Sequence, residues 1–242
     1  MITERGQKKM RIMTFNTQHC KNFLTKEIDY AKMAEAIKRF SPDIVGLNEM
    51  RDVLCEPEYY KQTESLASLL DYPYHYFAKA IEIRGNTPFS YGNGFISKYK
   101  IEEATSIPIA LPKDKRTFLY YESRVLLKVR LENGYTVLVT HFGLSLEEKL
   151  AALKAVLENL EDEKCILMGD FNVRPDGDIL LPIRDKMKDC ASVCEKEILT
   201  FPSDKPDRKI DYIFVSRDVE VVSFDAVNLI ASDHIPLVAE IC

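Results

Sequence analysis

The sequence has no tryptophan, no long hydrophobic run and no surplus of basic residues. A membrane-spanning helix needs about 18 or more consecutive apolar residues, so none is predicted. Without tryptophan the chain also lacks a side chain suited to wedging between DNA bases or anchoring at a lipid interface, so no membrane insertion is expected. The 33 Lys and Arg residues are outnumbered by 38 Asp and Glu, which gives a net charge of −5. Because phosphate neutralisation supplies most non-specific affinity for DNA, a nucleic-acid partner is possible but not favoured.

The amino-terminal segment and the cysteines indicate a cytoplasmic protein. Residues 1–16 carry charges throughout and lack the apolar stretch of a secretory signal. The six cysteines include no Cys-x-x-Cys pair, so reduced thiols are expected. Cys190 and Cys194 could together hold a metal, but two small buried side chains are the simpler interpretation.

Ten short segments rich in Val, Ile, Phe and Tyr are predicted to be strands. Asn133 and Gly134 fall between two of them and suit a type I′ hairpin turn, so part of the sheet structure is antiparallel. Nothing resembling a linker divides the chain, and we predict one domain over residues 1–242. The predicted strands are Arg11–Asn16, Asp43–Asn48, Tyr74–Ile83, Gly92–Ser97, Val125–Leu131, Thr136–His141, Cys165–Asp170, Ile210–Val215, Val219–Val227 and Pro236–Ile241.

Helices are predicted between the strands from apolar residues at helical spacing. The first helical stripe begins at Tyr30 and stops before Ser41-Pro42, where proline disfavours continuation of a helix. The second begins at Leu146 and is preceded by Ser145, which forms a capping-box pattern with Glu148. Both stripes are interpreted as core-facing. Strands and helices alternate without a strict βαβ rhythm, so a mixed-sheet α/β sandwich is predicted in place of a parallel doubly wound sheet. The stripes are Tyr30, Met33, Ala34 and Ile37, then Leu146, Leu150, Leu153, Leu157 and Leu160; Leu66, Leu69 and Leu70 indicate a short third helix.

Polar side chains stand at the ends of the predicted strands, where ligand sites form in sheet proteins. Four carboxylates, two carboxamides and two imidazoles make an oxygen-rich set that matches Mg²⁺ or Mn²⁺ better than Zn²⁺. Clustered carboxylates repel one another unless a cation or substrate charge enters. Each residue alone has an ordinary alternative, such as an Asx turn or a strand cap. Together we expect them in one cleft: Asn16, Glu49, His141, Asp170, Asn172, Asp211, Asp233 and His234.

In this order the residues resemble the endonuclease/exonuclease/phosphatase superfamily of deoxyribonuclease-like, metal-dependent phosphoesterases. The resemblance covers nearly the whole chain and implies a four-layer α/β sandwich, with two mixed, mainly antiparallel sheets packed face to face and flanked by helices. Segments 16–19 and 200–211 further resemble a compact bacterial-type branch. The matching motifs are Thr14–Thr17, Asp43–Glu49, Tyr91–Ser97, Val139–Phe142, Leu167–Asn172, Ile210–Ser216 and Ser232–Leu237.

The resemblance also implies which residues hold a metal. Asn16 and Glu49 match the first metal-binding pair of the superfamily, with Glu49 as the main ligand, and Asp233 matches a further metal-side carboxylate. The implied cofactor is therefore Mg²⁺ or Mn²⁺.

Five catalytic positions follow from the same resemblance. Asp170 matches the residue that deprotonates the attacking water, and Asn172 beside it orients the phosphate. His234 matches the histidine that contacts the scissile phosphate, and Asp211 the carboxylate that orients it. His141 matches a histidine suited to the leaving-group side.

The substrate is the least determined feature. His19, Arg124, Arg174 and Arg208, with Lys209, lie near the motifs and could contact an anionic group, although solvated loop charges are the alternative. A chain of 242 residues leaves little beyond a catalytic sandwich. We therefore expect a monomer that hydrolyses a small phosphomonoester or phosphodiester, including one resembling a phospholipid head group. A nuclease is the alternative enzyme, and a catalytically inactive binding module of the same fold is the alternative of another class.

Overall fold

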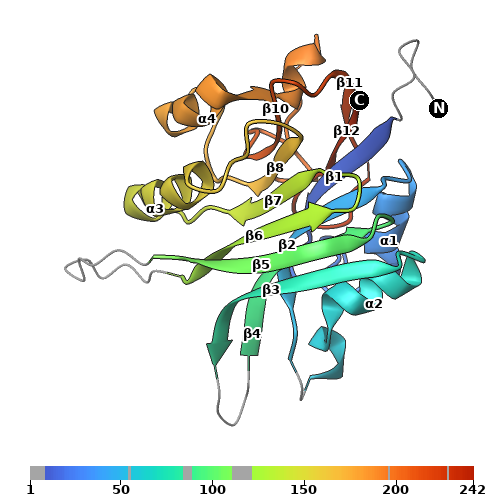
Figure 1. The fold of residues 1–242 in the computed structure, drawn as a ribbon. Helices are drawn as coiled ribbons and strands as arrows, with labels where there is room; N and C mark the ends of the chain where they lie inside the picture. The colour runs from blue at the N-terminus through green and yellow to red at the C-terminus, as the bar shows by residue number, and fades with distance from the viewer. Residues whose placement is uncertain (1–8, 54–55, 84–88, 111–121, 196, 228) are drawn as a thin grey trace.

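Two six-stranded β-sheets pack face to face in the computed structural model of the protein, and helices cover both outer faces (Figure 1). The structure describes residues 9–53, 56–83, 89–110, 122–195, 197–227 and 229–242. This arrangement is the four-layer sandwich that the resemblance implied. Within the described part of the chain, none of the helices is long and apolar enough to cross a membrane.

The first sheet has the strand order β11-β12-β1-β2-β4-β3. β1 and β2 are parallel, and the other neighbours are antiparallel. The parallel pairing brings the ends of β1 and β2 to the same edge of the sheet. The strands are β1 Met10–Asn16, β2 Ile44–Arg51, β3 Tyr74–Ile83, β4 Phe89–Ser97, β11 Val221–Ala226 and β12 Leu237–Ile241.

The second sheet has the strand order β5-β6-β7-β8-β10-β9, with β7 and β8 parallel and the remaining pairs antiparallel. Its register places Asp170 beside His141 on one neighbouring strand and beside Asp211 on the other. Three predicted site residues are therefore adjacent through backbone pairing alone. The strands are β5 Ile101–Ile109, β6 Arg124–Leu131, β7 Thr136–His141, β8 Cys165–Asp170, β9 Met187–Asp189 and β10 Asp211–Ser216.

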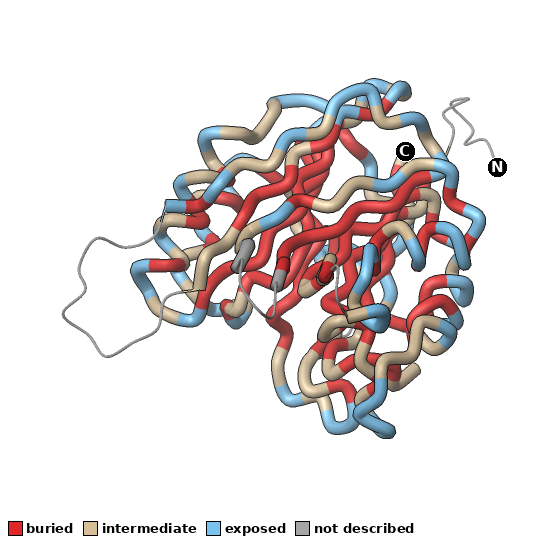
Figure 2. The backbone as a smooth tube through the Cα atoms, turned by 90° about the horizontal axis from the view of Figure 1, so that it is seen from below, coloured by how far each residue is buried: buried red, intermediate tan, exposed pale blue. Residues whose placement is uncertain are grey.

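Three apolar clusters fill the interfaces between the four layers. One lies between the sheets, where Gly46 of β2 allows close approach, because a Cβ there would stand 2.6 Å from the Met168 sulfur. The central strands are buried on both faces, which explains their continuous apolar sequences (Figure 2). The helices are α1 Tyr30–Lys38 and α2 Gln62–Leu69 on the first sheet, α3 Leu146–Leu157 and α4 Leu181–Lys186 on the second, and the short 3₁₀ segments Pro57–Tyr59, Asp178–Leu180 and Cys190–Val193.

Two strands were not predicted, and one turn was predicted wrongly. β5 and β9 went unnoticed because consecutive polar residues, Glu102-Glu103 and Thr105-Ser106, interrupt the apolar residues of β5, and β9 has three residues. The turn between β6 and β7 is not type I′. Gly134 has a positive φ of 84° and donates its N–H to Leu131 O at 2.9 Å. Asn133 does not adopt a positive φ, so the loop is a type I turn followed by a left-handed glycine.

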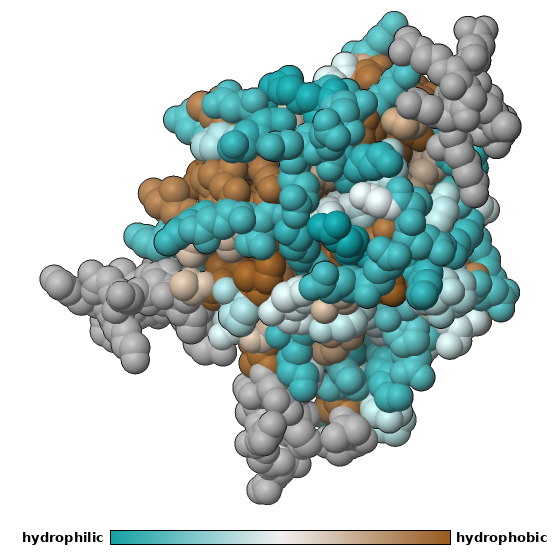
Figure 3. All heavy atoms as spheres, in the orientation of Figure 1, coloured by the Kyte–Doolittle hydropathy of each residue, from teal (hydrophilic) through white to brown (hydrophobic). Residues whose placement is uncertain are grey.

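The leucine stripe of α3 was only partly correct. The capping box of Ser145 and Glu148 is present, but Leu146 and Leu150 are 59% and 50% exposed. Leu153 of the stripe is buried, and Ala152 and Val156 complete the buried face, because the helix lies on the sheet at a different rotation. Hydrophobic atoms consequently reach the surface at the level of α3 (Figure 3).

The described cysteines are free thiols. Cys190 is buried and Cys194 is half-buried, and both pack against the cluster between the sheets, so they are small core side chains as predicted. Cys55 lies outside the described residues.

Candidate active site

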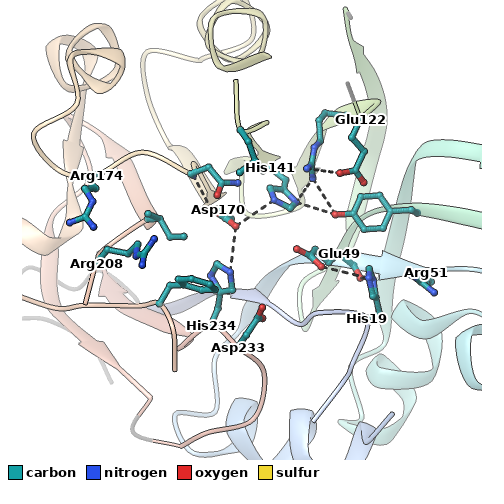
Figure 4. A pocket seen from close by; sticks show the side chains of 16 residues that line it. His19, Glu49, Arg51, Glu122, His141, Asp170, Arg174, Arg208, Asp233 and His234 are labelled. Carbon is teal, nitrogen blue, oxygen red and sulfur yellow. Dashed lines mark hydrogen bonds and ion pairs between the residues drawn. The ribbon is translucent and has the colours of Figure 1, made fainter. Parts of the chain in front are cut away.

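A pocket of about 610 Å³ opens where strand ends of both sheets meet (Figure 4). β1, β7 and β8 end at Asn16, His141 and Asp170, and β10 begins at Asp211. Asn16 and Asp211 lie behind the pocket wall and contact the residues that line it. Six residues of the predicted set form part of the lining: Glu49, His141, Asp170, Asn172, Asp233 and His234.

Asp170 occupies the centre of these contacts and is 2% exposed. Its Oδ1 accepts the backbone N–H of Asn172 at 2.9 Å, so the Asx turn considered as an ordinary alternative is present. Its Oδ2 accepts a hydrogen bond from Asn16 Nδ2 at 3.1 Å and faces Nε2 of His141 at 3.4 Å and of His234 at 3.7 Å. Burial raises the pKa of Asp170 to about 7, although His234 opposes the shift. The carboxylate can therefore exchange a proton near neutral pH.

His234 and Asp211 form a buried pair behind this carboxylate. His234 Nδ1 donates to Asp211 Oδ2 at 2.9 Å. Burial alone lowers the pKa of His234, but Asp211 and then Asp170 outweigh it and raise the pKa to about 10. The imidazole is thus cationic at neutral pH and presents Nε2 to the pocket.

Glu49 is placed in the pocket by a bulge in β2. The register of β2 against β4 shifts between Leu47 and Met50, and Glu49 has a positive φ of 61°. Its Oε1 accepts from Asn16 Nδ2 at 3.1 Å, and its Oε2 lies 3.7 Å from His19 Nε2. Burial raises the pKa of Glu49, while burial lowers the pKa of His19 to about 4. Neither the Asn16 amide nor the neutral His19 imidazole compensates the negative charge of the Glu49 carboxylate.

Left-handed backbone recurs among the residues of the pocket. His19 has φ 61° within the run Gln18 to Cys20, in which every residue is left-handed, and Asn172 has φ 50°. Such conformations cost of order 1–3 kcal/mol for residues other than glycine and cluster at functional sites. Here the left-handed conformations direct the side chains of His19 and Asn172 towards the pocket, whereas a regular strand end would point them elsewhere.

Asp233 lies on the same side of the pocket as Glu49. Its Oδ2 accepts from Gln18 Nε2 at 2.9 Å and its Oδ1 from Ser232 Oγ at 2.9 Å. The charge of Asp233 also contributes to the raised pKa of Glu49. Two carboxylates that repel each other on one side of a pocket could together hold a divalent cation.

A second group has metal-binding chemistry, because Asp170, Asp211 and His234 offer ligand atoms within 4.8 Å of one another. Asp211 and His234 already satisfy each other through their hydrogen bond. We therefore favour Glu49 and Asp233 as the oxygen donors for a cation. Asn16, which was predicted beside Glu49 in the metal site, accepts the backbone N–H of Gln18 on its Oδ1 at 3.1 Å and donates from its Nδ2 to Glu49 Oε1 at 3.1 Å.

Arg124 meets His141 on the opposite wall. Arg124 Nη1 lies 2.7 Å from His141 Nδ1 and donates to the Tyr91 hydroxyl at 3.1 Å, and Nη2 donates to Glu122 Oε2 at 2.7 Å. Burial, and then the charge of Arg124, lower the pKa of His141 well below its usual range. Neither Tyr91 nor Glu122 was predicted as a site residue: Tyr91 begins the matching motif Tyr91–Ser97 but was given no role, and nothing in the local sequence marks Glu122.

The remaining candidate cations separate into two groups. Arg174 and Arg208 line the pocket, and Arg208 stands over the Phe201 ring, whose other neighbour is the His234 ring at 4.8 Å. Lys209 does not reach the pocket. It is buried and pairs with Asp189 at 3.1 Å, so the suggestion that it contacts substrate was wrong.

Two buried carboxamides join the sheets directly beneath Asp170. Asn48 Nδ2 donates to Asn93 Oδ1 at 2.9 Å and to Thr140 O at 2.8 Å, and Asn48 Oδ1 accepts the Asp170 N–H at 3.0 Å. Asn93 Nδ2 donates to Val125 O at 2.8 Å. Both residues lie within the matching motifs, but only the packed sheets reveal their function.

The two-sheet sandwich and this pocket define a phosphoesterase class of fold and site. A model of the Endonuclease/Exonuclease/phosphatase family matches residues 13–234, and the chain belongs to this family. A search of curated proteins found no match.

Solved structures of low sequence identity share the fold. An endonuclease/exonuclease/phosphatase from Beutenbergia cavernae is 22% identical with a TM-score of 0.78, covering 97% of this chain and 72% of its own. One from Bacteroides vulgatus is 23% identical with a TM-score of 0.72, over 98% and 99% of the two chains. A mannosyl-6-phosphatase from Bacteroides thetaiotaomicron is 16% identical with a TM-score of 0.72, over 96% and 99%.

Proposed function

We propose that the protein is a Mg²⁺- or Mn²⁺-dependent hydrolase of small phosphate esters that uses water as the nucleophile. The observation that carries this proposal is the convergence at Asp170. Residues from separate strands and loops bring two imidazoles and an amide to one buried carboxylate oxygen, with a second pair of carboxylates beside it. A structural role alone does not require this costly grouping of buried charge.

Asp170 is the general base in this proposal. Its pKa near neutrality suits it to accept a proton from water while the water oxygen attacks phosphorus. The hydrogen bond from the Asn172 backbone and that from Asn16 fix the carboxylate plane. The base is therefore oriented before substrate enters.

His234 stabilises the negative charge that develops on the phosphoryl oxygens. Its imidazolium presents Nε2 to the pocket, and Asp211 holds the ring through Nδ1. The Asn172 amide donates one hydrogen to Phe142 O at 2.9 Å, which leaves its second hydrogen for a phosphate oxygen. We assign His141, which presents Nε2 to the pocket at 3.4 Å from Asp170 Oδ2, to the leaving group.

Glu49 and Asp233 would hold the divalent cation, with Asn16 orienting Glu49. When bound, such a cation supplies Lewis-acid stabilisation of phosphate charge. The carboxylate of Glu49, whose pKa is raised chiefly by burial, would be compensated by that cation.

The lining favours a small substrate with a second anionic or polar group. A pocket of about 610 Å³ accommodates a small molecule. Arg174 supplies positive charge on one side, together with Arg208, whose guanidinium also pairs with the exposed Asp207 carboxylate. Phe201, Ile210 and Leu144 supply apolar contacts. The structural neighbour that acts as a mannosyl-6-phosphatase is in keeping with such a substrate.

A substrate panel tests this function. Purified protein is incubated with sugar phosphates, glycerophosphodiesters, oligonucleotides and supercoiled plasmid, each with Mg²⁺, Mn²⁺ or EDTA, beside an Asp170→Asn control. Release of phosphate or alcohol from a small ester, dependent on the cation and absent in the control, is the expected result. Plasmid nicking as the dominant reaction would favour the nuclease, and no turnover of any ester would favour the inactive binding module.

A further inference from the structure

Two imidazoles face the same oxygen of Asp170, and opposite charges stand behind them. His234 has Nε2 at 3.7 Å from Asp170 Oδ2, and its Nδ1 is held by the Asp211 carboxylate at 2.9 Å. His141 has Nε2 at 3.4 Å from the same oxygen, but its Nδ1 meets the Arg124 guanidinium at 2.7 Å. The two rings therefore cannot carry their protons in the same way.

The contact with Arg124 determines which nitrogen of His141 is protonated. A guanidinium has five N–H donors and no acceptor. At 2.7 Å, Arg124 Nη1 must donate to a lone pair on His141 Nδ1. The Tyr91 hydroxyl, 3.4 Å from the same nitrogen, can also donate because it accepts from Arg124. The single proton of the neutral ring then resides on Nε2, which faces the pocket.

Arg124 is itself held in this position. Its Nη2 donates to Glu122 Oε2 at 2.7 Å and its Nη1 to Tyr91 at 3.1 Å. The Arg124 side chain is only 10% exposed, although it reaches the pocket wall from the start of β6. Using the guanidinium to bind substrate would require breaking a short ion pair in a partly dry environment.

We propose that Arg124 is a positioning residue that holds His141 as the Nε2-protonated tautomer, so that His141 is a neutral hydrogen-bond donor to the substrate oxygen beside Asp170. Glu122 and Tyr91 complete the support. The role of His141 as donor rests on the proposed phosphoesterase function, whereas the tautomer does not. A wrong tautomer would present a lone pair to an anionic oxygen and repel it.

The tautomer is measured directly by long-range ¹H–¹⁵N correlation spectra of histidine-labelled protein. The chain has four histidines, so His141 is assigned by its absence in His141→Gln. In the wild type we expect the unprotonated nitrogen to be Nδ1. In Arg124→Met, which removes the donor, the proton should redistribute between the two nitrogens. Arg130→Met is the matched control, because Arg130 lies on the same strand with an exposed side chain.

Kinetics then separate positioning from substrate binding. Arg124→Met should lower kcat roughly 10- to 100-fold with little change in KM, as loss of a residue that orients a ligand commonly does. It should cause no further loss in a His141→Gln background. An unchanged His141 tautomer, or a raised KM with unaltered kcat, would overturn the proposal and make Arg124 a substrate contact.

A milder variant keeps the proposal testable if Arg124→Met does not fold. Glu122→Gln leaves Arg124 in place but weakens its anchor, and it should shift the His141 tautomer and kcat in the same direction to a smaller extent. A Glu122→Gln protein with wild-type spectra and wild-type kcat would count against the proposal. If the wild type hydrolyses no phosphate ester, the proposed function fails, while the nitrogen spectra still decide the assignment of Arg124.

Discussion

Replacing Asp211 by Asn removes the charge behind His234 and preserves the size of the side chain. Asp211 and His234 are 2% and 5% exposed, so water screens their 2.9 Å contact weakly. Asp211 is the largest of the charges that raise the pKa of His234 to about 10 against the effect of burial. The substitution should therefore lower this pKa strongly.

The size of the shift follows from the contact. An opposite charge at this distance moves a pKa by about 1–3 units, and each unit corresponds to about 1.4 kcal/mol. From its value of about 10, the pKa of His234 should fall to between about 7 and 9 in Asp211→Asn. The protonated fraction at pH 8 then drops by up to about tenfold, whereas at pH 6 it stays near its original level.

The pH dependence of kcat measures this change. The active form carries the proton on His234, so activity is lost as the pH rises through the pKa of His234. The alkaline limb of the kcat–pH profile should therefore lie at lower pH in Asp211→Asn than in the wild type. Asp189→Asn is the control, since Asp189 pairs with Lys209 outside the pocket and should affect stability without moving the limb. His234→Ala should abolish the limb.

Two results would refute this reasoning. One is a loss in Asp211→Asn of equal size at every pH. The other is a double variant, Asp211→Asn with His234→Ala, whose loss equals the product of the single losses. Either result would make Asp211 act independently of His234, as a metal ligand or a structural cap.

Three further outcomes are expected. Asp170→Asn should lower kcat by about 10²–10⁴-fold while calorimetric Mg²⁺ affinity stays near that of the wild type; recovery of activity by added Mg²⁺ would contradict its role as base. Glu49→Gln should weaken Mg²⁺ binding, with activity partly restored at high Mg²⁺, and full activity of the wild type in EDTA would reject a cation site. Burial raises the pKa of the Cys20 thiol to about 12, so a thiol reagent at pH 8 should modify Cys20 only after unfolding in urea; mass spectrometry of the labelled peptide detects earlier modification.

The sequence predicted the long apolar strands, including the edge strand β3, and missed β5 and β9. Strands buried on both faces, such as β8, consist of consecutive apolar residues and were predicted with correct bounds. β5 lies at an edge of its sheet, and the polar pairs Glu102-Glu103 and Thr105-Ser106 interrupt its apolar residues, so its local pattern contained little signal. Its pairing with β6 supplies the stability that the strand's own residues do not.

The motif residues of the pocket could be predicted because each follows or begins an apolar strand. Their partners could not. Glu122 and Tyr91 come from different strands or loops and meet only at Arg124, and Lys209 is adjacent to the motif residues in sequence but points into the core. Position at the end or start of an apolar strand identified the site residues, whereas the direction of each side chain depended on sheet packing.

The carboxamide pair Asn48 and Asn93 has a consequence for engineering the scaffold. Apolar packing between sheets has no preferred direction, so it resists sliding weakly. The hydrogen bonds from these two amides of the first sheet to Thr140 O, the Asp170 N–H and Val125 O of the second sheet fix one lateral position. Because that fixed point lies under Asp170, the sheets can be repacked at their far ends with the catalytic groups still aligned. The tolerance of core positions to mutation should therefore be low near the two amides and rise with distance from them. Core residues chosen for combinatorial substitution should lie at the end of the sandwich remote from the pocket.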